Sequence, residues 1–204
     1  TSVYLFTEAN LAYTEILFII ISSMFAGDLI SRDFSKEGLY MLTQPISRSK
    51  MFFAKFFSAV TVALILASVY MLGAFGTSLL LYNYIIPDWY EIVLLSFLAI
   101  LSLLSFVTLF SAVIRSPTIS ITVSIFTLLI IFPLAQEIME DLKMTPSYII
   151  TYALESIVAL AQPSGLQLVQ APPLNLAVEI FVGYLLLGVL ISLVVYKKRQ
   201  LSDV

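Results

Sequence analysis

The chain has 204 residues, of which 60% are hydrophobic and only 11% charged, and its formal net charge is −3. Soluble domains carry about a quarter charged residues, so this composition argues against a water-soluble core and indicates lipid as the solvent. The chain contains neither cysteine nor histidine. Disulfides, thiolate metal sites and histidine acid–base catalysis are therefore excluded, and no catalytic or metal-binding residue is expected.

Five apolar stretches are long enough to cross a membrane as helices, which takes about 20 residues each. The first is interrupted only by Glu15, and the last is stopped by Lys197 and Lys198. We predict an all-α fold, a polytopic membrane helix bundle with five transmembrane helices that form a single domain over residues 1–204. In chain order, the predicted spans are residues 11–27, 56–87, 92–114, 116–136 and 180–196.

The segment between the last two predicted spans, residues 137–175, is broken by turn-forming residues. Pro163, Gly165, Pro172 and Pro173 fall in its second half, and proline both removes a helical hydrogen bond and clashes with the preceding turn. Irregular backbone at membrane depth persists only where protein or a water-filled cavity shields it. We predict short broken external or partly re-entrant helices here and no sixth span.

The basic residues indicate the orientation. Of the ten lysines and arginines, only Lys143 falls on the opposite side of the five predicted spans from the others. By the positive-inside rule, the segment after the first span and the C-terminus are cytoplasmic, which predicts a multi-pass protein of the cell (plasma) membrane. The net charge combines a basic inner face with an acidic outer face, and it gives no indication of a nucleic-acid partner.

An odd number of spans places the two termini on opposite sides, with residue 1 outside. Thr1 is not an initiator methionine, and residues 1–10 do not resemble a signal peptide. We hypothesise that a preceding span is missing from this sequence, which is the simplest explanation for a first residue on the outer side.

Much of the charge lies in one stretch between the first two spans, residues 28–56, "DLISRDFSKEGLYMLTQPISRSKMFFAKF". Helical spacing places four of its charged residues on one polar stripe, and Gly38 and Pro45 limit how far a helix can continue. Ser47 or Ser49 can cap the helix that follows. This pattern indicates a docking element for a cytoplasmic partner, or a solvated loop that only obeys the positive-inside rule. The stripe consists of Arg32, Asp33, Lys36 and Glu37.

Residues 31–59, "SRDFSKEGLYMLTQPISRSKMFFAKFFSA", resemble the permeases of type-2 ABC exporters. Those permeases join two spans by an acidic residue with glycine, a leucine-rich turn, a "P-[IV]-S-R" turn and a lysine that opens the next helix. The matching positions in this chain are, in the same order, Glu37-Gly38, residues 39–42, residues 45–48 and Lys55. Leu39 departs from the usual threonine or serine. The five spans, the broken segment before the last one and the basic end "YKKRQL" also fit, but the family's first span is absent.

The resemblance implies one half of a transporter. Two such permeases, identical or homologous, would pair in the bilayer, and P-loop ATPase subunits that bind ATP and Mg would dock on the cytoplasmic face. The chain itself would then be no enzyme and would need no cofactor. Residues 28–50 would couple ATP hydrolysis to transport, with the role assigned to Arg32, Asp33, Lys36, Glu37, Gly38, Pro45, Ser47, Arg48 and Lys50.

Two further groups of residues are candidates for function. Glu15 and Glu155 are carboxylates in apolar surroundings, where charges tend to mark pathways or polar interfaces, although either could instead lie at the water boundary. Small residues let membrane helices approach closely, which makes one set in the first span a candidate for packing against a second subunit, or simply within the chain. This set is Ser22, Ser23, Ala26 and Gly27.

Two other classes of function compete with a permease. A structural or anchoring subunit of a larger membrane complex, such as an energy-converting one, would explain the scarcity of titratable residues in the spans, but not the charged stretch followed by "PISR". A membrane-embedded enzyme is disfavoured, because no histidine, cysteine or carboxylate pair gathers at one depth.

Overall fold

The fold is described from a computed structural model that covers residues 2–34, 47–83, 88–162 and 171–198. Within these ranges every regular element is helical. The order is α1 (Ser2–Ala26), the 3₁₀ helix η1 (Ser31–Phe34), α3 (Arg48–Tyr82), α4 (Trp89–Val113), α5 (Pro117–Phe126), the π-helix η2 (Thr127–Ile131), α6 (Phe132–Asp141), α7 (Ile150–Ala159) and α8 (Leu174–Lys198).

The described residues contain five helical stretches that are long and apolar enough to cross a membrane. The prediction of an all-α, multi-pass membrane bundle is therefore confirmed. Helix α3 begins at Arg48 after Ser47, which agrees with the predicted cap at Ser47 or Ser49. Other ends differ from the predicted spans: α1 begins at Ser2, α3 ends at Tyr82, the fourth stretch ends at Asp141 and α8 begins at Leu174. With 35 residues, α3 is about 50 Å long, more than the ~30 Å of a bilayer core. Hydropathy locates apolar stretches but not the residues at which their helices begin and end, which accounts for these differences.

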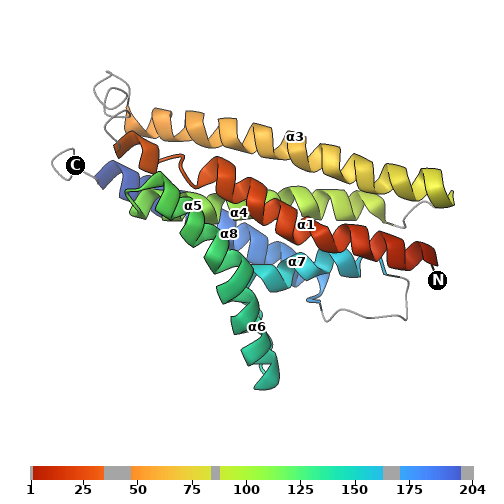
Figure 1. Ribbon diagram of the computed structural model, residues 1–204. Helices are drawn as coiled ribbons and strands as arrows, with labels where there is room; N and C mark the ends of the chain where they lie inside the picture. Colours follow the sequence, from red (N-terminus) through yellow and green to blue (C-terminus); the bar gives the residue numbers. More distant parts are fainter. Residues whose placement is uncertain (1, 35–46, 84–87, 163–170, 199–204) are drawn as a thin grey trace.

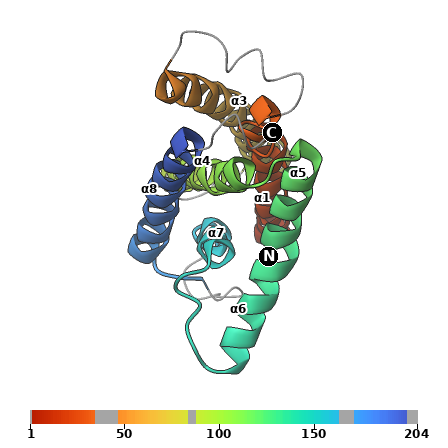
Figure 2. The same ribbon diagram turned by 90° about the vertical axis from the view of Figure 1, so that its left-hand side faces the viewer.

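Helix α4 forms the centre of the bundle. It contacts α1, α3, α5, α7 and α8, and its most extensive contact is with α8. Figure 2 shows α1 and α8 on either side of α4, with α3 above and α7 below. The surrounding helices keep outward faces of large apolar side chains, such as Val69, Leu72 and Leu187, exposed. These faces are suited to lipid and not to water.

Helices α4 and α8 approach each other closely at a glycine. A Cβ atom added to Gly188 would lie 2.7 Å from the carbonyl carbon and oxygen of Ser105. The Ser105 hydroxyl also donates a hydrogen bond of 2.7 Å to the carbonyl of Leu185. Close backbone approach at small residues combined with an interhelical hydrogen bond is a characteristic means of joining helices in a bilayer.

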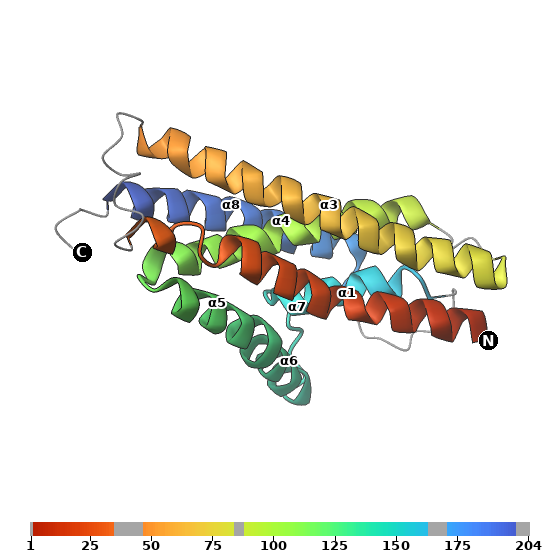
Figure 3. The same ribbon diagram turned by 45° about the horizontal axis from the view of Figure 1, so that its top comes forward.

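The fourth spanning stretch diverges from the bundle, as Figures 1 and 3 show. Its first part, α5, packs on α1 and α4, whereas α6 contacts α7 and extends away from the rest of the bundle. The π-helical turn Thr127–Ile131 lies between them, and Pro133 follows directly. Proline provides no N–H to the preceding turn and its ring crowds the carbonyl four residues earlier, that of Leu129, which accounts for a helix interrupted at this point.

Helix α7 lies in the segment predicted to be broken and external. At ten residues it is too short to span a bilayer, yet it is packed against α8 and α1, with Ile150, Leu154 and Ile157 buried. Two hydrogen bonds hold this region to α8 and to the residues just before it: Tyr184 to the carbonyl of Tyr148 (2.8 Å), and Ser156 to the carbonyl of Pro172 (3.1 Å). Pro163 and Gly165 lie outside the described residues.

Candidate functional site

Polar contacts between distant parts of the chain gather where η1, the start of α3 and the end of α8 meet (Figures 1 and 3). We call this the basic end of the bundle, because Arg32, Arg48, Lys55 and Lys197 lie there. Helix α1 ends at Ala26, and the backbone turns at Gly27 into η1. The N–H groups of Ile30 and Ser31 both donate to the hydroxyl of Ser111 on α4, at 2.9 and 3.1 Å. The Ser111 hydroxyl thus satisfies two N–H groups at the turn and fixes η1 on α4.

Asp33 is the centre of the site. It is only 1% exposed, and both of its carboxylate oxygens have partners. The Tyr196 hydroxyl of α8 donates to Oδ2 at 2.8 Å, and the Lys55 ammonium of α3 forms an ion pair with Oδ1. A buried carboxylate is tolerated only with such partners, because burial removes it from water. The Asp33 cluster, defined as Asp33, Lys55 and Tyr196, therefore joins η1, α3 and α8.

Aromatic rings shield the Asp33 cluster from one side. The ring of Tyr196 lies 6.1 Å from that of Phe34 in an edge-on arrangement and 6.3 Å from that of Phe52, and Phe52 stacks on Phe56 at 6.0 Å. These distances are typical of favourable aromatic pairs. Because the rings exclude water, the charge interaction between Asp33 and Lys55 is screened less than it would be at an open surface.

The first residue of α3 is fixed to the same helix. A guanidinium nitrogen of Arg48 donates to the carbonyls of Tyr196 and Lys197, at 3.3 and 3.4 Å. The last carbonyls of a helix have no partner within the helix, so cations there are favourable. Asp33 before residues 35–46 and Arg48 after them both bind Tyr196, so the two flanks of that segment meet at the end of α8.

The structure describes five of the nine predicted coupling residues. Arg32 pairs with Asp28 at 2.8 Å and is 72% exposed, and Lys50 is exposed too. Asp33 does not share an exposed stripe with Arg32 but is buried, and its carboxylate binds Lys55 of α3 and Tyr196 of α8. Ser47 occupies the N-cap position of α3, but its side chain makes no capping hydrogen bond. The other four, Lys36, Glu37, Gly38 and Pro45, lie outside the described residues.

The sequence interpretation missed two members of this site. Tyr196 directly precedes the basic stop and could have been taken only as an interfacial aromatic residue. Ser111 is one of several serines in an apolar helix, and nothing in its neighbours distinguishes it. Lys55 was noted as part of the family resemblance, but not as the partner of Asp33.

A second polar group lies toward the opposite end of the bundle, between α6 and α7. The amide nitrogen of Gln136 donates to Glu155 at 2.7 Å and to Glu140 at 3.2 Å, and Thr151 donates to the Gln136 carbonyl oxygen at 3.4 Å. Glu15 of α1 is close enough to interact electrostatically with Glu155. The structure thus brings together the two carboxylates that were predicted to mark a pathway or polar interface, and that role stays a prediction.

The protonation of Glu155 should affect stability. Burial raises the pKa of this carboxyl above its ordinary value of 4.5, and Glu140 raises it further, although the hydrogen bond from Gln136 lowers it. A raised pKa in the folded state means that folding favours the protonated form. The stabilisation by the protonated carboxyl is complete at pH values below the ordinary pKa. It is lost as the pH rises through the raised pKa of the folded state. The other carboxylates near it are Glu140 on α6, which accepts from the same Gln136 amide, and Glu15 on α1, which interacts with it electrostatically.

We therefore expect Glu155→Gln to reduce the loss of stability between pH 5 and pH 8, because glutamine resembles the protonated carboxyl. The measurement is the unfolding temperature of the purified protein in mild detergent at both pH values. Glu137→Gln is the matched control, since Glu137 lies exposed on α6. An equal pH dependence in the wild type and Glu155→Gln would contradict the expectation.

The small residues of α1 are packed within the chain. Ser22, Ser23 and Ala26 are 0% exposed, and a Cβ added to Gly27 would lie 2.7 Å from Cγ1 of Ile121 on α5. In this structure they serve intrachain packing, while a contact between α1 and a second subunit stays a prediction. The outward side chains of α1, including Tyr13, Ile16 and Met24, are the ones that such a contact would use.

No protein-family model and no curated protein matches this chain. Within the described residues, no group of three or more acidic side chains is placed to hold a metal ion. The interactions at the basic end attach helices to one another. A buried ion pair, a tyrosine and an arginine join η1 and the start of α3, which flank the charged segment, to the end of α8.

Proposed function

We propose that this chain is the transmembrane subunit of an ATP-driven type-2 ABC exporter. In this proposal it forms the translocation path in the plasma membrane together with a second, identical or homologous permease, and its C-terminus is cytoplasmic. Separate P-loop ATPase subunits bind ATP and Mg and dock on the segment between α1 and α3. The observation that carries the proposal is that Asp33 and Arg48, on the two flanks of this segment, both bind Tyr196 of α8.

This arrangement suits a coupling element better than a loop that merely carries positive charge. A solvated loop has no need of a buried acid, whereas Asp33 is buried and links to α3 and α8. Displacement of residues 35–46 by a docked ATPase would move η1 and the start of α3 together and would act on the end of α8. Packed interfaces of this kind switch between discrete arrangements and do not deform continuously.

ATP would then drive transport by changing the populations of two arrangements of the permease pair. Binding of ATP to the docked subunits favours one of two arrangements of the permease pair, and a substrate is moved only if it interacts differently with the two. In this scheme the chain supplies the path and the attachment, while the partner subunits supply hydrolysis.

Charge reversal in the coupling segment tests this proposal. Arg32→Glu, Lys36→Glu and Glu37→Lys should each weaken ATPase docking, by about tenfold in affinity, since an interfacial ionic contact contributes about 1.4 kcal/mol. Membrane insertion should remain intact, because Arg32 is exposed. The readouts are the amount of copurifying ATPase and ATP-dependent transport.

Glu137→Lys, at the exposed surface of α6, is the control for charge reversal away from the basic end. Unchanged docking and transport in all three coupling variants would overturn the coupling assignment. A loss of docking that Glu137→Lys reproduces would show a general charge effect instead.

A further inference from the structure

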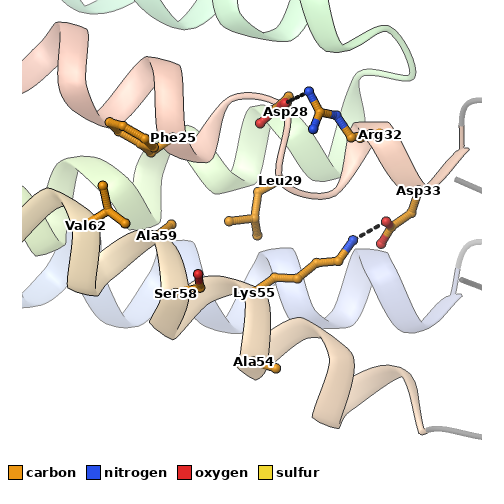
Figure 4. A pocket seen from close by; sticks show the side chains of 10 residues that line it. All are labelled: Phe25, Asp28, Leu29, Arg32, Asp33, Ala54, Lys55, Ser58, Ala59 and Val62. Carbon is orange, nitrogen blue, oxygen red and sulfur yellow. Dashed lines mark hydrogen bonds and ion pairs between the residues drawn. The ribbon is translucent and has the colours of Figure 1, made fainter.

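A cavity of about 780 Å³ opens between α1 and α3 at the basic end. Figure 4 shows that its lining changes in character along the bundle. The charged side chains of Arg32, Asp33 and Lys55 lie toward one end, and Phe25 and Val62 lie toward the other. The cavity therefore offers charge at the basic end and apolar surface toward the membrane interior.

This gradient matches the orientation of a lipid in the adjacent leaflet. Val62 follows Lys55 by seven residues of one helix, which places it about 10 Å deeper along α3. A phospholipid in that leaflet has its headgroup at the water boundary and its acyl chains pointing toward the midplane. The charged end of the cavity thus lies at the depth of the lipid headgroup, and its apolar end lies at the depth of the acyl chains.

Small side chains of α3 create the hollow. Ala54, Ser58 and Ala59 line the cavity on that helix, and none of them extends far enough to fill it. The apolar walls are accessible, since Phe25 and Val62 are each 37% exposed. An acyl chain along this groove would cover apolar surface on both α1 and α3.

The charged end can bind a phosphate without breaking its own ion pairs. The Lys55 ammonium has three N–H donors, and Asp33 is the carboxylate that it contacts. The Arg32 guanidinium is 72% exposed while paired with Asp28, so it remains accessible from the cavity mouth. The lining thus holds two cations, Arg32 and Lys55, each beside a carboxylate, Asp28 or Asp33. Cationic side chains between transmembrane helices are known to hold phosphate-bearing lipid headgroups.

We propose that this cavity binds one glycerophospholipid of the leaflet at the basic end, with its phosphate on Lys55 and Arg32 and an acyl chain in the groove over Ser58. The bound lipid bridges α1 and α3 next to the Asp33 cluster. This inference does not depend on the proposed exporter function and holds for any role of the bundle.

The test measures binding of phosphatidylglycerol to the full chain, purified in mild detergent, by native mass spectrometry. Ser58→Leu fills the groove without touching an ion pair, and we expect it to weaken binding about tenfold, which corresponds to about 1.4 kcal/mol. Thr77→Leu is the matched control: Thr77 is exposed on the same helix, outside the cavity. Arg32→Gln should also weaken binding of the lipid.

Equal binding by the wild type and Ser58→Leu would overturn the proposal, and so would an equal loss in Thr77→Leu. Competition with soluble glycerol phosphate separates the two sources of phosphate. We expect no displacement of phosphatidylglycerol at concentrations at which the lipid is saturating. Full displacement would show a site for a free phosphate and would contradict a lipid site.

Discussion

Gly188→Ala should destabilise the folded bundle by about 3 kcal/mol, because the added methyl group overpacks a close contact between α4 and α8. The new Cβ would lie 2.7 Å from main-chain atoms of Ser105, which cannot move aside as a flexible side chain can. It would also meet the Ser105 hydroxyl, which donates to the carbonyl of Leu185. The helices must therefore separate, and both packing and a hydrogen bond are lost.

Gly183→Ala is the control for the intrinsic effect of alanine on the same helix. Outside the neighbouring backbone of α8, no heavy atom of the described residues lies within 4 Å of a Cβ added at Gly183. The higher helix propensity of alanine should therefore stabilise the protein by up to about 1 kcal/mol. Unfolding of both variants in mild detergent, followed by the loss of helical circular dichroism, measures the difference. Equal stability of the two variants would contradict the observed contact between α4 and α8.

Lys55→Met should have the second large effect, of about 3 kcal/mol, because it leaves the Asp33 carboxylate buried without its cation. The side chain of Asp33 is 2% exposed, whereas that of Lys55 is 24% exposed. The reciprocal variant Asp33→Asn leaves an ammonium that water can still reach, so we expect a smaller cost of about 1 kcal/mol. The two partners of one ion pair thus differ in the cost of their removal.

The measurement is again unfolding in mild detergent, with Lys50→Met as the control for loss of an exposed lysine on α3. The double variant Lys55→Met/Asp33→Asn should be less destabilised than the sum of the single variants, because neither charge is then left unpaired. Additive effects, or a larger cost for Asp33→Asn than for Lys55→Met, would show that the Asp33 cluster is not a buried ion pair.

The bundle itself could be predicted from the sequence because lipid imposes strict requirements on a spanning helix. Hydropathy located all five spans, and prolines indicated the broken segment around α7. The end of the fourth span at Asp141 and the start of α8 at Leu174 were missed, since hydropathy does not mark the residues at which a helix begins and ends. The divergence of α6 could not be predicted either: Pro133 indicates an interruption, but the direction that follows depends on tertiary packing.

The basic end was predicted only in part. Charge and the family resemblance drew attention to residues 28–50, but they suggested an exposed amphipathic helix in which Asp33 accompanies Arg32. In the structure, Asp33 faces the interior, because partners on α3 and α8 compensate its charge. Lys55 and Tyr196 lie 22 and 163 positions away from it in the sequence, and no local pattern connects residues at such separations.

The two carboxylates at the opposite end illustrate the same limit. Glu15 and Glu155 were each identified as a charge in an apolar stretch, but their proximity depends on how α7 packs against α1. Gln136, which donates to Glu155, gave no signal, because one amide near the end of a spanning helix is common at a membrane boundary.

The most direct test of the exporter proposal is purification of the protein from its native membrane in mild detergent, with identification of every chain that copurifies. We predict a P-loop ATPase in roughly equal amount, reduced in the Arg32→Glu variant and retained by Glu137→Lys. Recovery of redox or structural subunits in place of any ATPase would contradict the proposal and would indicate an anchoring subunit of a larger membrane complex.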